Sequence, residues 1–268
     1  MAYDVPLPEG MKSDVGGWAE SAAVIARKIH LLVRREGLRG TLRLARHKYR
    51  YVAEFTPARR RARRELSEFD RAHGVSTSAI LDPSELGIAG PSAAFCFGHQ
   101  PSPPERFAEI IGGLPIRFED FVFVDVGSGL GRALLLAAEF PFQRVVGIEL
   151  SAELDDVART NIARYASPRQ RCRQIESIVG DAVTFAWPPT PLVVYLYNPF
   201  DAPVLSRVVQ SLEASLAARP RDALVVYYYA KFREVLAGRA TLTLLQADDE
   251  LVIYRSIPVH EDEDRRAA

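Results

Sequence analysis

Apolar residues recur every three or four positions in the first part of the chain, which is the spacing of an amphipathic helix. The residues of the first such face are Trp18, Ala22, Ile25, Ile29 and Leu32. The same spacing returns over residues 38–52, and Thr56 followed by Pro57 is typical of the start of a third helix. This third helix is expected to end near Gly74. Residues 1–75 are therefore predicted to form a helical extension.

From residue 105 the pattern changes to short apolar runs that alternate with helical segments. The predicted strands are residues 121–126, 145–150, 177–182, 192–198 and 223–229. The predicted helices are residues 105–114, two that begin near Arg132 and Ala152, and residues 202–217. This alternation, with strands that are apolar almost throughout, is typical of a parallel sheet covered by helices on both faces. Two further β-rich runs, residues 241–246 and 250–256, predict a hairpin that completes the sheet.

The connection between these two parts is rich in proline and glycine and has no sustained period over residues 76–104. Connections of this length in compact domains usually have a functional role. We interpret it as a cover for an active site. The expected organisation is a basic helical extension over residues 1–75, this cover, a catalytic domain over residues 105–258 and a charged tail over residues 259–268.

The first long strand runs into a glycine-rich turn and then directly into a helix. The segment reads Asp125-Val126-Gly127-Ser128-Gly129-Leu130-Gly131-Arg132. Glycine lets the chain turn sharply and lets a ligand approach the backbone, and the helix that follows offers free N–H groups. A structural turn without a ligand is the alternative interpretation.

Two carboxylates follow the next two strands. Glu149 ends the second strand, 22 positions after Gly127, where an acid in a nucleotide site accepts hydrogen bonds from ribose hydroxyls. Asp181 follows the third strand at the same edge of the sheet and suits an adenine amino group, although an aspartate there is as often a helix cap. The three features together predict a nucleotide site.

These residues resemble motifs I, II and III of the class I S-adenosylmethionine (SAM) dependent methyltransferases, over roughly Pro103 to Ser256. The glycines are spaced GxGxG, whereas dinucleotide-binding dehydrogenases have GxGxxG. The resemblance implies a Rossmann-like, mostly parallel seven-stranded sheet and SAM as the cofactor. The segment is also similar to a group of uncharacterised bacterial methyltransferases, and more distantly to seven-β-strand protein lysine methyltransferases with a DLGSGxGR motif.

The resemblance also implies which residues hold each part of SAM. Asp125 with the glycine turn would surround the methionine part, Glu149 would hold the ribose hydroxyls, and Asp181 with Ala182 would flank the adenine. The full set of implied cofactor residues is Asp125, Gly127, Ser128, Gly129, Gly131, Glu149, Leu150, Asp181, Ala182 and Asn198.

Asn198-Pro199-Phe200 follows the fourth strand and resembles the Asn-Pro-Pro-Tyr/Phe motif of amino-group methyltransferases, with one proline missing. The resemblance implies that Asn198 holds the acceptor nitrogen, and the alternative is a simple strand-to-loop turn. His99, which follows the loop aromatics Phe95 and Phe97, is a candidate general base because histidine titrates near neutrality. An ordinary loop histidine is the alternative.

Charge is distributed unevenly, although the net charge is zero. Residues 1–75 hold 16 Lys and Arg against 9 Asp and Glu. Five of these side chains form a cluster of Arg59, Arg60, Arg61, Arg63 and Arg64. The cluster predicts either a solvated face paired with nearby glutamates or weak contact with nucleic acid or an anionic membrane.

The two cysteines, Cys96 and Cys172, have no metal-ligand or disulfide spacing, so no metal site is predicted. No signal peptide or membrane span is expected, and we predict a cytoplasmic protein. The predicted function is methyl transfer from SAM to a nitrogen or oxygen, with a protein lysine or a small molecule slightly favoured. The alternatives are a binding or scaffold protein that acts through its basic extension, and an aminopropyl-type transferase on the same fold.

Overall fold

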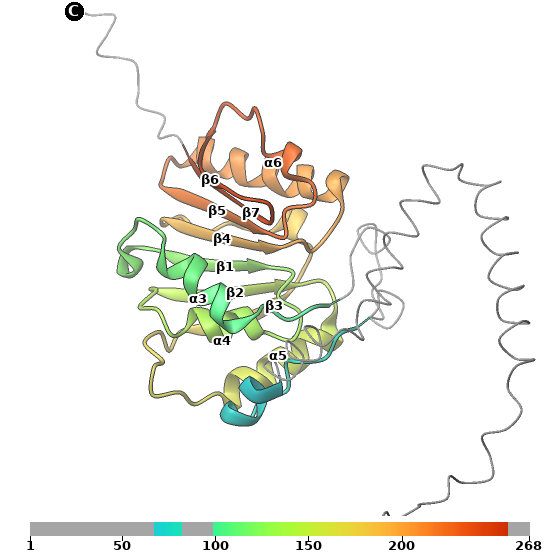
Figure 1. Ribbon diagram of the computed structural model, residues 1–268. Helices are drawn as coiled ribbons and strands as arrows, with labels where there is room; N and C mark the ends of the chain where they lie inside the picture. Colours follow the sequence, from blue (N-terminus) through green and yellow to red (C-terminus); the bar gives the residue numbers. More distant parts are fainter. Residues whose placement is uncertain (1–66, 82–98, 257–268) are drawn as a thin grey trace, which may run out of the picture. The chain divides into compact units, whose positions relative to one another are not determined.

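The computed structural model describes residues 67–81 and 99–256 (Figure 1). The helices predicted before residue 67, the arginine cluster, Phe95, Phe97, Cys96 and the charged tail lie outside the described residues. Residues 67–73 are helical and the chain turns at Gly74, where the third helix of the extension is predicted to end. The domain boundary at residue 75 stays a prediction, although Phe69 and Val75 already pack into the main hydrophobic core.

The described residues form one seven-stranded sheet with the order β3-β2-β1-β4-β5-β7-β6 (Figure 1). The strands are β1 Val122–Val126, β2 Arg144–Glu149, β3 Ile175–Val179, β4 Leu192–Tyr197, β5 Ala223–Tyr228, β6 Leu242–Ala247 and β7 Leu251–Ser256. Strands β1 to β5 pair in parallel, while β7 lies antiparallel between β5 and β6. The predicted mostly parallel sheet with a terminal hairpin is confirmed.

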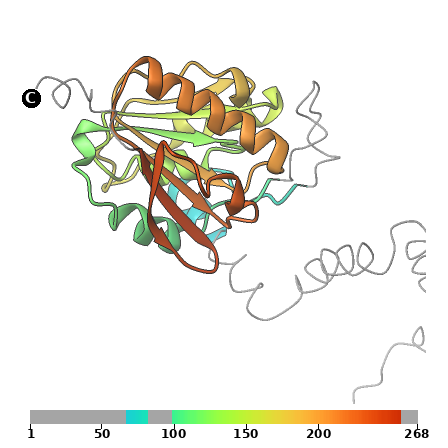
Figure 2. The same ribbon diagram turned by 90° about the horizontal axis from the view of Figure 1, so that it is seen from above.

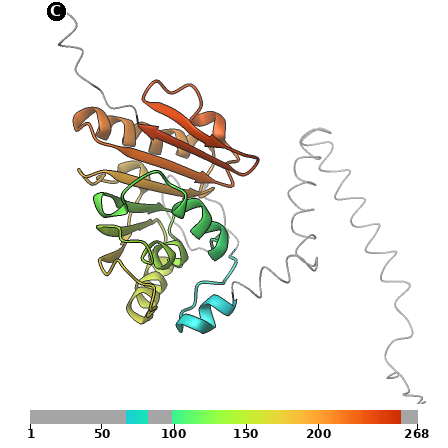
Figure 3. The same cartoon turned by 60° about the vertical axis from the view of Figure 1, so that its left-hand side comes forward.

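Helices cover both faces of this sheet (Figures 2 and 3). The helices are α3 Pro104–Gly112, α4 Arg132–Ala137, α5 Ala152–Arg164 and α6 Ala202–Ala218, with short 3₁₀ turns η4 Phe118–Asp120, η5 Ala182–Thr184 and η6 Arg233–Val235. Helices α5 and α6 begin at side chains that accept a backbone N–H, Ser151 and Asp201 respectively. Buried residues of α3 and α4 belong to one core cluster and those of α6 to another.

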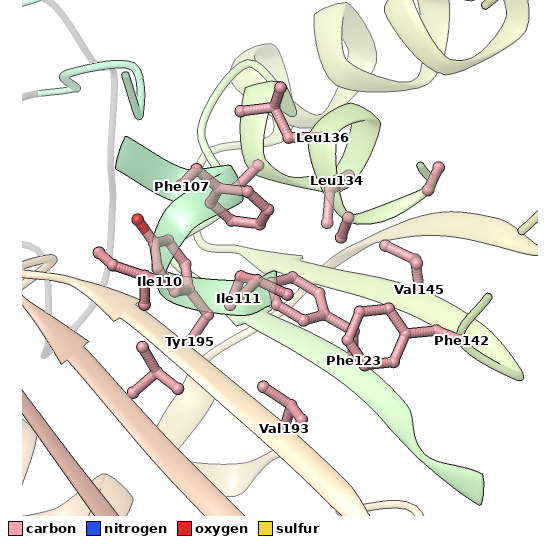
Figure 4. Packing of buried hydrophobic residues seen from close by; sticks show 14 of the residues in the cluster. Phe107, Ile110, Ile111, Phe123, Leu134, Leu136, Phe142, Val145, Val193 and Tyr195 are labelled. Atoms are coloured by element: carbon pink, nitrogen blue, oxygen red, sulfur yellow. The ribbon is translucent and has the colours of Figure 1, made fainter. Parts of the chain in front are cut away.

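The alternation of side chains along each strand produces these two clusters. Phe123 and Tyr195 point to the α3 and α4 side, whereas Val124 and Leu196 point to the α6 side. Figure 4 shows the first cluster, in which the Phe107 ring of α3 meets the Tyr195 ring edge-on at 5.1 Å between centroids. Both faces are therefore closed by apolar packing, and the strand ends remain as the place for a polar site.

Because β1 to β5 run in the same direction, their carboxyl ends meet at one edge of the sheet. The glycine turn follows β1, Glu149 ends β2, Asp181 follows β3 and Asn198 follows β4. Within residues 67–81 and 99–256, no helix is both long and apolar enough to cross a membrane. The same residues contain no group of three His, Cys, Asp or Glu arranged to hold a metal ion.

Candidate functional site

A cavity of about 850 Å³, including its open mouth, lies at this edge of the sheet. Its walls come from five places: the segment 99–102, the glycine turn, the ends of β2 and β3, and the segment that joins β4 to α6. The cavity therefore brings together most of the residues that the sequence predicts as a site.

The glycine turn is closely covered on two sides. Gly127 and Gly129 have positive φ values of 79° and 53°, a conformation that side-chain-bearing residues rarely adopt. A Cβ atom on Gly127 would lie 2.7 Å from the Pro199 Cβ, and one on Gly129 would collide with the His99 ring. Both positions therefore require glycine because of the backbone conformation and because of close neighbours.

Ser128 and Gly131 complete the turn in different ways. Ser128 lines the cavity, and its buried Oγ has no hydrogen-bond partner among the described residues. Gly131 has a φ of 85° and precedes α4, and a Cβ there would lie 3.2 Å from the Ala158 Cβ. Gly131 is not part of the cavity wall. It serves packing between α4 and α5, so direct cofactor contact at Gly131 stays a prediction that this position does not favour.

Glu149 joins the end of β2 to the glycine turn. Its Oε2 accepts from the Gly129 N–H at 2.8 Å, and its Oε1 accepts from the Ser151 N–H at 2.9 Å. Burial raises the pKa of Glu149, and these backbone donors partly oppose the rise. A carboxylate has about four acceptor positions. With backbone donors at Gly129, Ser151 and Leu150, the side chain keeps acceptor capacity for a ligand hydroxyl while it holds the turn.

Asp125 is the most deeply buried acid of the cavity, with an exposed fraction of 4%. Burial, together with the nearby Glu149 charge, raises the pKa of Asp125 to about 8. Its register neighbour on β4 is Tyr195, whose hydroxyl lies 3.1 Å from the Ser102 Oγ. A cationic ligand group next to Asp125 would favour the charged carboxylate and lower this pKa.

Asp181 and its neighbours form the far end of the cavity. The Asp181 Oδ1 accepts from the Val183 N–H at 2.9 Å, so the side chain caps the turn η5, as the alternative interpretation expects. Asp181 and Ala182 also line the cavity. Leu150 lines it as well, together with the apolar residues Ile148 and Leu154. A carboxylate beside an apolar wall is a suitable environment for a flat base with an amino group.

Asn198 is the predicted site residue whose position differs most from the expectation. It is not part of the cavity wall, which here consists of Tyr197, Pro199 and Phe200. Its Oδ1 accepts from the Tyr227 hydroxyl at 3.0 Å, and its φ of 43° is left-handed. Cofactor contact and acceptor binding by Asn198 stay predictions, and its hydrogen bond to Tyr227 weighs against both.

His99 lines the cavity with its ring against Gly129. Burial lowers the pKa of His99 to about 4, and the nearby Arg132 charge contributes to the lowering, while a backbone interaction with Thr77 opposes it. The imidazole is therefore neutral at pH 7. It is free to accept a proton but is a much weaker base than an ordinary histidine. Its role as general base stays a prediction.

One residue of the cavity wall, Arg132, and one that packs behind the wall, Gly147, were not singled out by the sequence. Arg132 lines the cavity and is almost fully buried, with an exposed fraction of 1%. Gly147 lies inside β2, where a Cβ would be 2.7 Å from the Ser128 Oγ and from a Leu134 methyl. A glycine inside an apolar strand marks a close approach of another segment, so its position gave a usable signal. The sequence offered no comparable signal for Arg132, apart from its place directly after the glycines.

No family model matches the sequence, and no curated protein is significantly similar to it. Among solved structures, the chain is similar to the methyltransferase domain of a bacterial Hen1 protein (CtHen1-CN), with a TM-score of 0.41 and 17% identity over 56% of this chain and 96% of that one. The glycopeptide N-methyltransferase MtfA in complex with SAM gives a TM-score of 0.43 and 12% identity over 59% and 87% of the two chains. The ribosomal protein L11 methylase of Lactobacillus delbrueckii subsp. bulgaricus gives a TM-score of 0.39 and 16% identity over 59% of this chain and 77% of that one.

Likenesses this distant carry no argument about activity, so the assignment of the fold rests on the sheet itself. In doubly wound dinucleotide-binding proteins the strand order is 3-2-1-4-5-6. Here an antiparallel β7 is inserted between β5 and β6, and the first strand runs into the glycine turn. The sheet is therefore the Rossmann-like, mostly parallel seven-stranded sheet that the resemblance to the class I methyltransferases implies.

Proposed function

We propose that the protein transfers the methyl group of SAM to a nitrogen or oxygen atom of an acceptor and releases S-adenosylhomocysteine. One observation carries the proposal. The glycine turn, Glu149 and Asp181 line a single cavity at the carboxyl edge of a mostly parallel sheet that ends in an antiparallel hairpin. A dinucleotide-dependent dehydrogenase is a poorer match to this arrangement of strands and to the GxGxG spacing.

The chemistry of the cavity wall suits SAM. Apolar side chains lie next to Asp181, where an adenine would be held. Glu149 keeps acceptor capacity for a ribose hydroxyl in addition to its backbone donors. Asp125 lies deepest, and a buried carboxyl there would attract the positively charged amino group of the methionine part.

When it is bound, SAM supplies a methyl group that its sulfonium already activates. The protein then has to align the acceptor atom at roughly 3–3.5 Å from the methyl carbon and exclude water. Tyr197, Pro199 and Phe200 form the wall at the end of β4 and are the side chains placed to orient an acceptor. His99 is neutral at pH 7, and we keep it as the candidate that receives the acceptor's proton.

Two other functions fit less well. A scaffold protein would not need two glycines at positive φ and three carboxylates around one cavity. An aminopropyl transferase would need carboxylates for a polyamine, and the acids in the described cavity wall, Asp125, Glu149 and Asp181, all lie at the ends of β1 to β3. The wall at the end of β4, where an acceptor would lie, consists of Tyr197, Pro199 and Phe200 and holds no acid. We infer that methyl transfer matches this wall better than aminopropyl transfer to a polyamine does.

The class of acceptor is the finer part of the proposal. We favour a protein lysine or a small-molecule amine, because the segment after β4 resembles the acceptor motif of amino-group methyltransferases apart from one proline. Contact of the arginine cluster with nucleic acid or an anionic membrane, and a cytoplasmic location, stay predictions.

Incubation of the purified protein and a cell extract with SAM that carries a labelled methyl group tests the proposal. We expect label in the protein or small-molecule fraction with the wild type. The same extract incubated with Glu149→Gln should incorporate at least about ten-fold less, because one amide oxygen cannot both hold the turn and bind the ribose. Label in the nucleic-acid fraction alone would contradict the favoured acceptor class. Equal label with and without the protein would contradict methyl transfer.

A further inference from the structure

Residues 67–81 pack against the glycine turn at the start of the cavity. Residues 67–81 run beside α5 toward the carboxyl edge of the sheet (Figures 1 and 3). Thr77 is fully buried, and Phe69 and Val75 belong to the core cluster of α3 and α4. The segment is therefore an integral part of the folded domain.

Arg132 is the centre of this contact, and its location is unfavourable by itself. It is the first residue of α4, so its positive charge lies at the end of a helix that already carries positive partial charge. It is also almost fully buried, which removes the charge from water at a considerable free-energy cost. Such a residue has to be compensated by its neighbours.

The compensation comes from residues 69–78. The Arg132 Nη2 lies 3.1 Å from the Asp70 Oδ1 and donates to the Ser78 Oγ at 3.1 Å, and its Nε donates to the Thr77 Oγ1. The guanidinium also lies over the Phe69 ring, 4.4 Å from the centroid. One side chain of the glycine-turn helix thus contacts four residues of the segment.

Asp70 completes the arrangement, which we name the Arg132–Asp70 clasp and define as Asp70, Thr77, Ser78 and Arg132. The carboxylate accepts from the backbone N–H groups of Thr77 and Ser78, both at 2.8 Å. It also accepts from their two hydroxyls at 2.7 and 2.5 Å. These bonds fold residues 76–78 back onto the helix that carries Asp70 and hold them against Arg132.

A second tie comes from α5. The Asn161 Oδ1 accepts from the Ser76 N–H at 2.8 Å, and its Nδ2 donates to the Ser76 carbonyl at 3.0 Å. The same Nδ2 donates to the Leu130 carbonyl at 2.9 Å. Asn161 therefore connects the segment directly to the glycine turn.

The segment in turn connects to the cavity wall. The Leu81 N–H donates to the His99 carbonyl at 3.1 Å, and the two residues form an antiparallel bridge. His99 places its ring on Gly129 and begins the wall formed by residues 99–102. The clasp, the bridge and this wall are thus a continuous set of contacts from Arg132 to the cavity.

We propose that Arg132 and Asp70 are positioning residues that hold the wall of residues 99–102 over the glycine turn, so that the cofactor meets a preformed cavity. The clasp acts through Leu81 and His99. Its loss leaves the wall to be ordered when the ligand binds, and that ordering lowers affinity. The identity of the ligand rests on the proposed function, whereas the effect of the clasp on backbone order does not.

The test compares Asp70→Asn with Glu213→Gln. Both replace a partly buried carboxylate with its amide and break an ion pair to an arginine, Arg132 in one case and Arg239 in the other. The Glu213–Arg239 pair joins α6 to the segment before β6, and neither residue lines the cavity. A merely structural role predicts the same effects for both variants.

Two readouts are measured on the full chain: S-adenosylhomocysteine affinity by calorimetry and amide hydrogen exchange of residues 75–81. We expect Asp70→Asn to weaken affinity at least about five-fold and to speed exchange at Leu81, and Glu213→Gln to do neither. Thr77→Val, which removes one hydroxyl of the clasp, should give a smaller shift in the same direction and serves if Asp70→Asn does not fold.

The proposal is overturned if Asp70→Asn keeps the affinity and the amide exchange rates of the wild type. It is also overturned if Glu213→Gln loses affinity and exchange protection to the same extent as Asp70→Asn. If the wild type itself does not bind S-adenosylhomocysteine, the proposed function fails. The exchange comparison still decides whether the clasp orders the wall.

Discussion

At the scale of single residues, the carboxyl edge of the sheet concentrates conformations and charges that cost free energy. Asn198 and Tyr229, at the ends of β4 and β5, have positive φ values of 43° and 57°. Asp125 buries a carboxyl group next to another acid. Unfavourable features of this kind persist where the surrounding structure imposes them, and they gather at functional sites. Their position at one edge of the sheet agrees with the site that the cavity indicates.

Asp125→Asn tests the buried acid. The pKa of Asp125 is about 8 in the folded protein and about 3.8 in a model peptide, so the folded state holds a proton that the unfolded state has lost between these pH values. Stability contributed at this position therefore falls as pH rises from about 4 to 8. Asparagine does not titrate, so the variant's free energy of unfolding lacks this decrease. Relative to the wild type, the free energy of unfolding of the variant should therefore rise by about 1 kcal/mol or more from pH 5 to pH 8.

Urea denaturation at both pH values measures this gain, and calorimetry at pH 7.5 measures the expected loss of S-adenosylhomocysteine affinity. A wild type and a variant with parallel pH dependence would show that Asp125 is not protonated in the fold. A variant that binds as tightly as the wild type would remove Asp125 from the cofactor site.

Sequence reasoning located the main residues of the site because strand ends are readable from apolar runs. Gly127, Glu149 and Asp181 each follow such a run and all line the cavity. Their partners could not be predicted. Asp70 reaches Arg132 across 62 positions of sequence, and no local pattern specifies which buried charge meets which acid.

At the scale of elements, the ends of β4 and β5 decide what the acceptor motif does. Tyr227 points to the α6 side of the sheet, because alternate residues of β5 face opposite sides. Its hydroxyl holds Asn198 and also accepts from the Phe232 N–H at 3.3 Å. Asn198 thus connects two strand ends, a role that fits the alternative interpretation of a strand-to-loop turn.

Asn198→Gly and Asn198→Ala separate the two roles. Glycine adopts the left-handed conformation freely, so Asn198→Gly should keep stability within about 0.5 kcal/mol, while Asn198→Ala should cost about 1 kcal/mol more. If the backbone turn is the main role, Asn198→Gly retains both S-adenosylhomocysteine affinity and methyl transfer. A glycine variant that is stable and binds normally but transfers no methyl group would instead assign the acceptor to the Asn198 side chain.

The sequence also predicted the elements well where each carries its own pattern. The strand expected over residues 192–198 is β4 Leu192–Tyr197, and the helix expected over residues 202–217 is α6 Ala202–Ala218. The connection after residue 75 had no periodicity to interpret. Its bridge between Leu81 and His99 depends on contacts of both residues with the rest of the domain, which spacing alone does not reveal.

At the scale of the whole molecule, the arrangement of the sheet accounts for where the chemistry lies. Helices close both faces, and the strand order places the glycine turn next to the ends of β2 and β4. The cavity follows from this order because side chains that leave neighbouring parallel strands converge at their carboxyl ends. The net charge of zero does not indicate the site, and the positive excess of residues 1–75 is predicted to form either a solvated face or a contact with an anionic partner.

The most direct test of the account is a calorimetric titration of the wild type, Glu149→Gln and Glu176→Gln with S-adenosylhomocysteine. Glu176 is a matched control, since it is a half-exposed glutamate on β3 that pairs with Arg144 at the surface. We predict micromolar affinity for the wild type and for Glu176→Gln, and at least about ten-fold weaker binding for Glu149→Gln. Absence of binding to the folded wild type, or equal affinity in all three proteins, would contradict the assignment of this cavity to SAM.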